Sequence, residues 1–133
     1  MEYLLDTNIC IYIIKKKPLS VFERFKNTIA GSICISSITV AELQYGIMKS
    51  SIPEKNQEAL DKFLIPLEIL DFDFKATIEY GKIRADLEKK GMPIGPLDTL
   101  IASHALSLGL ILVTNNEKEF ERIAGLKIEN WVI

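Results

Sequence analysis

Short apolar runs alternate along this chain with longer segments whose apolar residues repeat every three to four positions. The runs predict buried strands, and the longer period predicts amphipathic helices. We expect strands over residues 3–5, 33–35, 68–70 and 110–113, and an edge strand over 127–132. We expect helices over residues 8–15, 19–29, 38–49, from 53 onward, 74–89 and 97–107, and a short helix over 117–122.

Two of these helices have clear apolar faces. In the segment 74–89, the buried face is predicted to carry Ala76, Tyr80, Ile83 and Leu87. In the segment 19–29, it is predicted to carry Phe22, Phe25 and Ile29, with Gly31 closing the helix.

The alternation of strands and helices indicates the fold class. Parallel strands need crossover connections, usually helices, and such helices cover both faces of the sheet. The chain has 133 residues, enough for one domain with its own core, and no linker or repeat divides it. We therefore expect one domain over residues 1–133, an α/β/α sandwich of three layers with a mostly parallel sheet of four to five strands.

Composition and charge exclude several classes of protein. Hydrophobic residues make up 48% and charged residues 26% of the chain, which is ordinary globular usage. No apolar run approaches the ~20 residues of a membrane helix. The first residues lack a basic leader, and Cys10 and Cys34 have no metal-binding spacing. We expect a cytoplasmic protein with two buried, reduced thiols.

The net charge is −2 and the pI is about 5.5. Domains that bind nucleic acid through a broad basic face usually have a pI above ~9. If nucleic acid is the substrate, something local must attract its phosphates, and a bound divalent cation would do so.

Acidic residues follow the predicted strands. Asp6 comes directly after the first strand, Glu42 lies in the first turn of the helix after the second, and Asp98 opens the helix that follows a Gly-Pro loop. The last buried strand is followed by Asn116, Glu117 and Glu119. Ligands of parallel α/β sheets bind outside the carboxyl ends of the strands, so we expect these side chains to share one rim.

Each acid also has a structural explanation. Asp6 could cap a helix, Thr39 with Glu42 fits a capping box, and Asp98 could stabilise a helix N-terminus. Glu117 and Glu119 could be solvated surface. These explanations account for helix starts, but they do not explain why strand ends facing one crevice all carry acids.

Clustered carboxylates need a counter-ion. Two carboxylates ~4 Å apart repel by about 4 kcal/mol at an effective dielectric near 20. An oxygen-only ligand set suits Mg²⁺ or Mn²⁺ rather than Zn²⁺. Such an ion can activate water and stabilise the in-line transition state of phosphodiester hydrolysis. The sequence therefore predicts metal-assisted phosphodiester cleavage.

Four ordered blocks make the chain similar to a known family. They are Leu-Leu-Asp-Thr-Asn at 4–8, Ser-Ile-Thr-Val-Ala-Glu-Leu at 37–43, Pro-Ile-Gly-Pro-Leu-Asp-Thr-Leu-Ile-Ala at 93–102 and Leu-Val-Thr-Asn-Asn-Glu-Lys-Glu-Phe at 112–120. Across nearly its whole length the chain resembles the PIN-domain ribonucleases, and closely the VapC-type toxins of toxin–antitoxin pairs. It departs from them at Leu97, where relatives often carry Asn.

The resemblance implies RNA cleavage by metal-activated water. It implies Asp6, Glu42 and Asp98 as the acidic centre, with Glu119 as the fourth acid and Asn116 as a polar neighbour. It also implies a VapB-type antitoxin as partner, whose tail inserts near the metal site. Toxins of this kind usually form dimers within larger complexes that bind operator DNA through the antitoxin. Some relatives cut tRNA, and others cut mRNA or ribosomal RNA.

Other residues are weaker candidates. Thr7 could orient water or phosphate, and Arg84 could contact RNA phosphate from the helix before the Gly-Pro loop. His104 is six residues from Asp98, about 240° around the helix, so we expect it outside the site. Trp131 is expected to pack in the core.

Two rival functions remain open. A phosphotransfer enzyme with an aspartate nucleophile would also place Asp6 after the first strand, although such sites commonly need a second acid where this chain has Asn8. A non-catalytic module that binds RNA or partner proteins is the other, and the intact set of acids argues against it.

Overall fold

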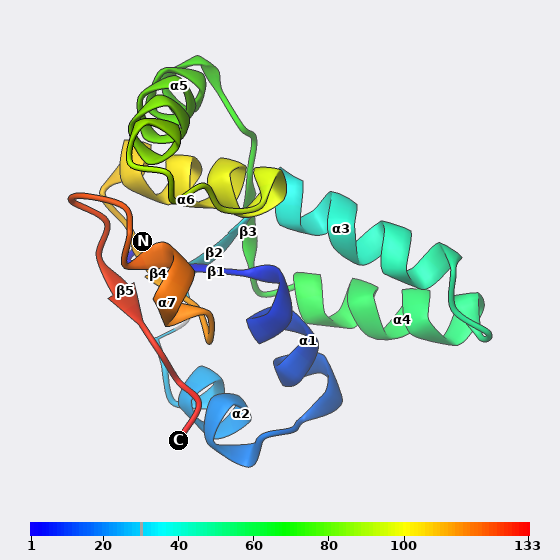
Figure 1. Cartoon of the computed structure of the whole chain (residues 1–133). Helices are drawn as coiled ribbons and strands as arrows, with labels where there is room; N and C mark the ends of the chain where they lie inside the picture. Colours follow the sequence, from blue (N-terminus) through cyan, green and yellow to red (C-terminus); the bar gives the residue numbers. More distant parts are fainter. Residues whose placement is uncertain (30) are drawn as a thin grey trace.

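The sheet contains five parallel strands in the order β3-β2-β1-β4-β5, with β1 in the centre (Figure 1). The computed structural model describes residues 1–29 and 31–133. The strands are β1 (Tyr3–Leu5), β2 (Ile33–Ser36), β3 (Glu68–Leu70), β4 (Ile111–Val113) and β5 (Ile128–Glu129). The predicted mostly parallel sheet is confirmed.

Seven helices are described, and they connect or flank these strands. They are α1 (Thr7–Lys15), α2 (Leu19–Lys26), α3 (Ser37–Met48), α4 (Pro53–Leu64), α5 (Phe74–Lys89), α6 (Pro96–Leu108) and α7 (Glu117–Phe120). None of the helices in the described part of the chain is both long and apolar enough to cross a membrane.

Alternate residues of the strands point to opposite faces of the sheet. Leu5, Ile35 and Val113 pack with α1 to α4 in one apolar cluster. Leu4, Cys34 and Leu112 pack on the other face with α5, α6 and α7. This alternation follows from the period of two along a strand, and it produces the predicted three-layer sandwich.

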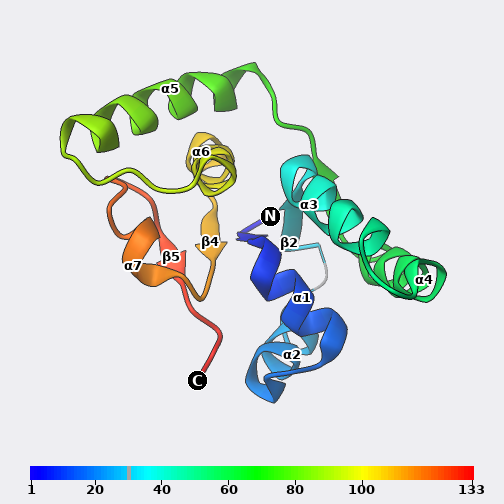
Figure 2. The ribbon, with the colours of Figure 1, turned by 45° about the vertical axis from the view of Figure 1, so that its right-hand side comes forward.

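The helices divide between these two faces. On one side, α3 and α4 form an antiparallel pair that extends away from the sheet, and α1 lies between this pair and α2 (Figure 1). On the other side, α6 covers the sheet and α5 packs on the outer side of α6 (Figure 2). The predicted face of α5 is confirmed, because Ala76, Ile83 and Leu87 are buried and Tyr80 is half-buried.

Several predicted boundaries were wrong. The second helix ends at Lys26, because Asn27 leaves helical geometry, and Ile29 is 80% exposed instead of buried. The last strand is limited to Ile128–Glu129, because the chain then turns and buries Trp131 in the core. The short helix predicted over 117–122 stops at Phe120. The position of β5 at the edge of the sheet is confirmed.

The topology determines where a site can form. From β1 the chain runs outward through β2 to β3, then crosses back to β4 on the other side of β1, so the direction of the strand order reverses beside β1. In parallel sheets this switch point opens a crevice at the carboxyl ends of the strands. Asp6 and Thr114 directly follow the two strands that meet there.

The core predicts a measurable contrast between a buried and an exposed residue. Leu4 is fully buried in the central strand, so Leu4→Ala is expected to lower the free energy of unfolding by about 2–5 kcal/mol, as cavity-forming substitutions do. Ile65 is 82% exposed, and Ile65→Ala is expected to change it by less than about 0.5 kcal/mol. Urea denaturation measures both, and equal losses would contradict this assignment of the core.

Candidate active site at the carboxyl ends of the central strands

Asp6 is the most enclosed acid of the predicted site, with only 5% of its surface exposed. It is the N-cap of α1, and the backbone N–H of Ile9 donates to its Oδ1 at 2.9 Å. Asp6 therefore caps a helix and also belongs to the acidic group. Helix α1 fixes the carboxylate at the end of β1.

Thr114 holds the other oxygen of Asp6. Leu5 pairs with Val113 across β1 and β4, so the next residue of each strand faces the same crevice. The fully buried Thr114 hydroxyl donates to Asp6 Oδ2 at 2.5 Å and accepts from the N–H of Asn116 at 2.9 Å. The sequence analysis missed Thr114. A small polar residue directly after a buried strand, as Asp6 follows β1, was the available signal.

Glu42 reaches the same rim from α3. The Thr7 hydroxyl, in the first turn of α1, donates to Glu42 Oε1 at 2.7 Å, so Thr7 lies beside one of the predicted acids. Glu42 was wrongly placed in the first turn, because α3 begins at Ser37 and Glu42 is its sixth residue. The capping-box explanation is also wrong: Ser36 is the N-cap, accepting from the Ile38 N–H.

Asp98 and Glu119 complete the acidic group. Asp98 lies in the first turn of α6, which begins at Pro96, and Glu119 lies on α7. The side-chain amide of Asn116 donates to Glu119 Oε2 at 2.8 Å. This contact fixes the orientation of the Glu119 carboxylate, so Asn116 takes the neighbouring position predicted for it.

The electrostatics show that these acids are close together. Burial raises the pKa of the Asp98 carboxyl to about 6, and the nearby charges of Glu119, Asp6 and Glu42 add to the rise. Burial also raises the pKa of Asp6, and the charge of Glu42 adds to this, although the hydrogen bonds from Thr114 and Ile9 oppose it. Four segments distant in sequence thus bring Asp6, Glu42, Asp98 and Glu119 to one rim.

Among the described residues, 1–29 and 31–133, no basic side chain forms an ion pair with these acids. Nor do three or more Asp, Glu, His or Cys side chains in these residues lie close enough together to hold a metal ion as one group. Mg²⁺ needs no such group, because it keeps several waters and binds through one or two carboxylates. The open all-oxygen rim therefore fits a hydrated Mg²⁺ or Mn²⁺ ion.

The remaining candidates lie outside the rim. Arg84 is exposed on α5, where its guanidinium contacts Tyr80 and Glu88. Glu117 is exposed and accepts from the side chain of Asn130 at 3.1 Å.

Four residues expected to be structural are buried. His104 has a structural place, with Nδ1 2.8 Å from Ser36 Oγ and the ring edge-on to Phe72. Cys10 and Cys34 are buried free thiols, as predicted. Trp131 packs in the core against Tyr3.

Known proteins match this chain over nearly its full length. The PIN domain family matches residues 3–126. The chain is 51% identical to the tRNA(fMet)-specific endonuclease VapC of Shigella flexneri, covering 98% of each chain, and 54% identical to ribonuclease VapC2 of Rickettsia felis with the same coverage. A crystal structure of DNA-bound VapBC from Salmonella typhimurium superposes with a TM-score of 0.94 at 51% identity, covering 99% of each chain.

These matches agree with the geometry of the site. The relatives at this level of identity are named ribonucleases or endonucleases, and PIN-domain nucleases generally depend on a divalent metal ion. The fold has the parallel sheet and flanking helices of the VapBC structures. The chain belongs to the PIN-domain family, and within it to the VapC ribonucleases.

Proposed function

We propose that this chain is the toxin of a toxin–antitoxin pair and that it cleaves RNA with Mg²⁺, or Mn²⁺, bound at the rim of Asp6, Asp98, Glu42 and Glu119 through waters and one or two of these carboxylates at a time. This proposal rests on the gathering of four carboxylates with no ion-paired basic side chain in the part of the chain that the structure describes. Such a rim costs electrostatic energy, and a divalent cation offsets that cost while attracting a phosphodiester.

The hydrogen bonds of the rim assign parts to its residues. Each oxygen of Asp6 accepts one hydrogen bond, from α1 at Oδ1 and from Thr114 at Oδ2. These bonds fix the orientation of the carboxylate, and each oxygen still has a lone pair that can bind a cation. Thr7 donates to Oε1 of Glu42, which leaves Oε2 of Glu42 to bind metal or water. Glu119 accepts from Asn116 at Oε2 and is also in side-chain hydrogen-bond contact with Asp98. A bound divalent ion supplies Lewis-acid stabilisation and lowers the pKa of a water ligand.

The substrate we propose is initiator tRNA in the cytoplasm. The Shigella and Salmonella relatives, 51% and 52% identical to this chain, are named tRNA(fMet)-specific endonucleases. Residues in all four elements of the rim would then act on one RNA phosphodiester. A phosphotransfer reaction through Asp6 is less well supported, because such sites commonly need a second acid two residues later, where this chain has Asn8. A module that only binds RNA would have no need for an uncompensated acidic rim.

The partner we propose is a VapB-type antitoxin, because the structural relatives are VapBC complexes, two of them bound to DNA. A groove of about 310 Å³ lies between α1, α3 and α4, and Glu42 is part of its lining. Its other walls are mostly apolar, including Ile11, Leu43 and Ile47. An apolar segment of the antitoxin in this groove would end beside the acidic rim. Homodimerisation within that complex, and contact with operator DNA through the antitoxin alone, belong to the same proposal.

Replacing the central acid should stop cleavage without unfolding the protein. Asp6→Asn keeps an acceptor for the Ile9 N–H but removes the charge, so RNA cleavage is expected to fall by about a thousandfold or more. Stability should be kept or raised, because repulsion within the rim is relieved. The matched control is Asp61→Asn on the exposed face of α4. Cleavage of a tRNA(fMet) transcript in Mg²⁺ measures both variants, and wild-type activity in Asp6→Asn would refute the assignment.

Asp98 predicts a pH-dependent stability of the metal-free protein. Its folded pKa, about 6, lies above the ordinary 3.8, so the folded state holds this proton more tightly than the unfolded chain. The resulting stabilisation is complete below about pH 4 and is lost as pH rises through 6. The Tm of the wild type relative to Asp98→Asn is therefore expected to fall between pH 4 and pH 7 in EDTA.

Adding Mg²⁺ at pH 7 should raise the Tm of the wild type and not that of Asp98→Asn. The exposed Glu54→Gln is the control and should behave as the wild type does in both measurements. A Tm difference that is independent of pH, or an equal response to Mg²⁺ in both proteins, would count against this electrostatic description of the rim.

The groove between α1, α3 and α4 predicts a selective loss of antitoxin binding. Gly46 lies in its wall, and an added Cβ there meets no atom within 4 Å, so Gly46→Leu should fill the groove without strain. Gly81 on α5 is equally unobstructed but lies outside the groove, which makes Gly81→Leu the matched control. Both should stabilise their helices by about 0.5–1 kcal/mol. Only Gly46→Leu should weaken the complex, about tenfold or more by calorimetry, and equal affinities would exclude this groove.

A further inference from the structure

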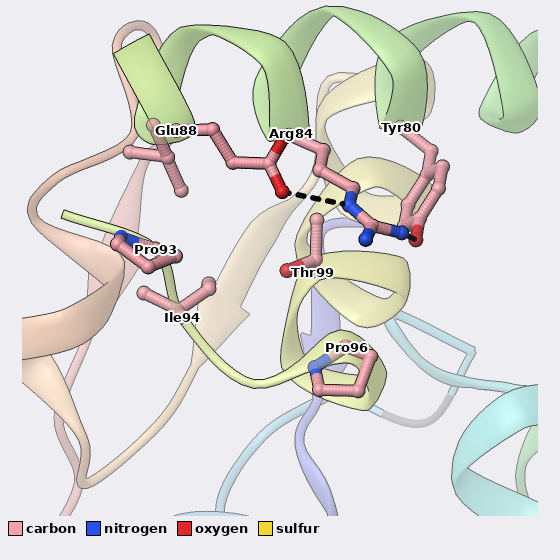
Figure 3. A pocket seen from close by; sticks show the side chains of 8 residues that line it. Tyr80, Arg84, Glu88, Pro93, Ile94, Pro96 and Thr99 are labelled. Atoms are coloured by element: carbon pink, nitrogen blue, oxygen red, sulfur yellow. Dashed lines mark hydrogen bonds and ion pairs between the residues drawn. The ribbon is translucent and has the colours of Figure 1, made fainter. Parts of the chain in front are cut away.

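A second cavity lies beside the acidic rim, between α5 and the segment that leads into α6 (Figure 3). It has a volume of about 210 Å³ and is lined by Tyr80, Arg84, Leu87, Glu88, Pro93, Ile94, Pro96 and Thr99. The side chains of α5 form one wall, and the prolines and Ile94 form the opposite wall. A slot with apolar walls and a few polar groups is suited to a flat molecule with a polar edge.

The loop over residues 93–96 separates this cavity from the rim. Gly95 is close to the rim, because a Cβ built on it would lie 3.8 Å from Asp98 Oδ2. The loop is held at both ends: Arg122 donates to the Pro93 carbonyl at 3.1 Å, and the Thr99 hydroxyl donates to the Gly95 carbonyl at 2.8 Å. The cavity wall is therefore preformed, and a chain bound across the loop would reach both sides of it.

Arg84 supplies the polar edge of the slot. Its Nε donates to Glu88 Oε2 at 3.3 Å and its Nη1 donates to the Tyr80 hydroxyl at 2.8 Å, so its guanidinium plane is fixed from both sides along α5. A guanidinium has five N–H groups, and three remain free for a ligand. Because Glu88 pairs with Arg84 at 3.3 Å, a bare phosphate here would also meet a carboxylate, and the slot favours a neutral ring with acceptor atoms.

We propose that this cavity, bounded by Arg84 and Tyr80 on α5 and by the 93–96 loop, binds one unpaired base of the RNA substrate next to the phosphodiester at the acidic rim. Single-stranded RNA is read by splayed bases that stack on aromatic rings or guanidinium planes and bond through their edges. The subsite rests on the proposed ribonuclease function and adds to it a part of the enzyme that selects the nucleotide beside the cut.

The test combines a protein variant with a base deletion. The cut in a tRNA(fMet) transcript is first mapped, and abasic nucleotides are then placed singly on either side of it. With the wild type, one of these substitutions is expected to raise KM by about tenfold to a hundredfold, the usual effect of losing one stacked base. With Arg84→Ala, KM for the intact RNA should rise by a similar factor. The same abasic substitution should then raise KM by less than about twofold more, because the missing base and the missing guanidinium remove the same interaction.

Two further variants separate stacking from charge. Arg84→Lys keeps the charge but loses the plane, so it should behave as Arg84→Ala does. Lys82→Ala removes a positive charge two residues away that borders a different groove, and it should leave KM unchanged. In all variants, kcat should stay within about twofold of the wild type and thermal unfolding should be unchanged.

The outcomes are distinguishable. If the wild type cuts no RNA, the ribonuclease function fails and the subsite with it. If the wild type cuts RNA, three results would refute the subsite alone. They are an equal KM for Arg84→Ala and Lys82→Ala, a wild-type KM for Arg84→Lys, and an abasic effect that persists fully in Arg84→Ala. If Arg84→Ala weakens binding of the antitoxin and leaves KM for RNA unchanged, the assignment of this cavity to an RNA base is also refuted.

Discussion

Repulsion among carboxylates at the carboxyl ends of the central strands is the main electrostatic cost of this fold. Asp6, Glu42, Asp98 and Glu119 come from four segments and share one rim without a basic partner among the described residues. Each pair at ~4 Å costs about 4 kcal/mol at an effective dielectric near 20. The fold therefore has to fix these carboxylates in place, and hydrogen bonds from neighbouring side chains and from the start of α1 do so.

Asp6 shows how one residue serves both stability and chemistry. Its Oδ1 closes the first turn of α1, and capping of this kind is worth about 1 kcal/mol. Its Oδ2 accepts from a buried threonine that belongs to the neighbouring strand. Both bonds favour the ionised form, and they oppose the effect of burial on its pKa. The same contacts that stabilise the fold thus keep a carboxylate available for a cation.

Periodicity along the chain was sufficient for the architecture. The helices and strands alternate as predicted, because the periods of 2 and 3.6 reflect which face of each element is buried. Boundaries were less predictable: Ile29 continues the apolar pattern of α2 in the sequence, but the helix has already ended at Lys26. Helix ends depend on local backbone contacts that the pattern does not contain.

The acids of the site were also predictable, because Asp6, Glu42 and Asp98 follow apolar segments that had to be strands or helices of a parallel sheet. Their supporting contacts were less so. Thr114 escaped notice because its partner lies 108 residues away and meets it only through the pairing of β1 with β4. Likewise, Ser36 replaced Thr39 as the cap of α3 because β2 runs directly into that helix. Such contacts depend on register between distant segments, and a single sequence does not contain that information.

An acidic protein that acts on RNA must divide attraction and recognition among different groups. With a net charge of −2, the chain cannot rely on a broad basic face, which supplies most of the affinity in many nucleic-acid-binding proteins. A cation on the rim would attract the phosphate locally, but it carries no information about sequence. A base slot whose arginine is already paired with Glu88 adds affinity through stacking rather than charge. Because the 93–96 loop lies against both features, changes in that loop are expected to alter which nucleotide is selected without altering the acids proposed to hold the cation.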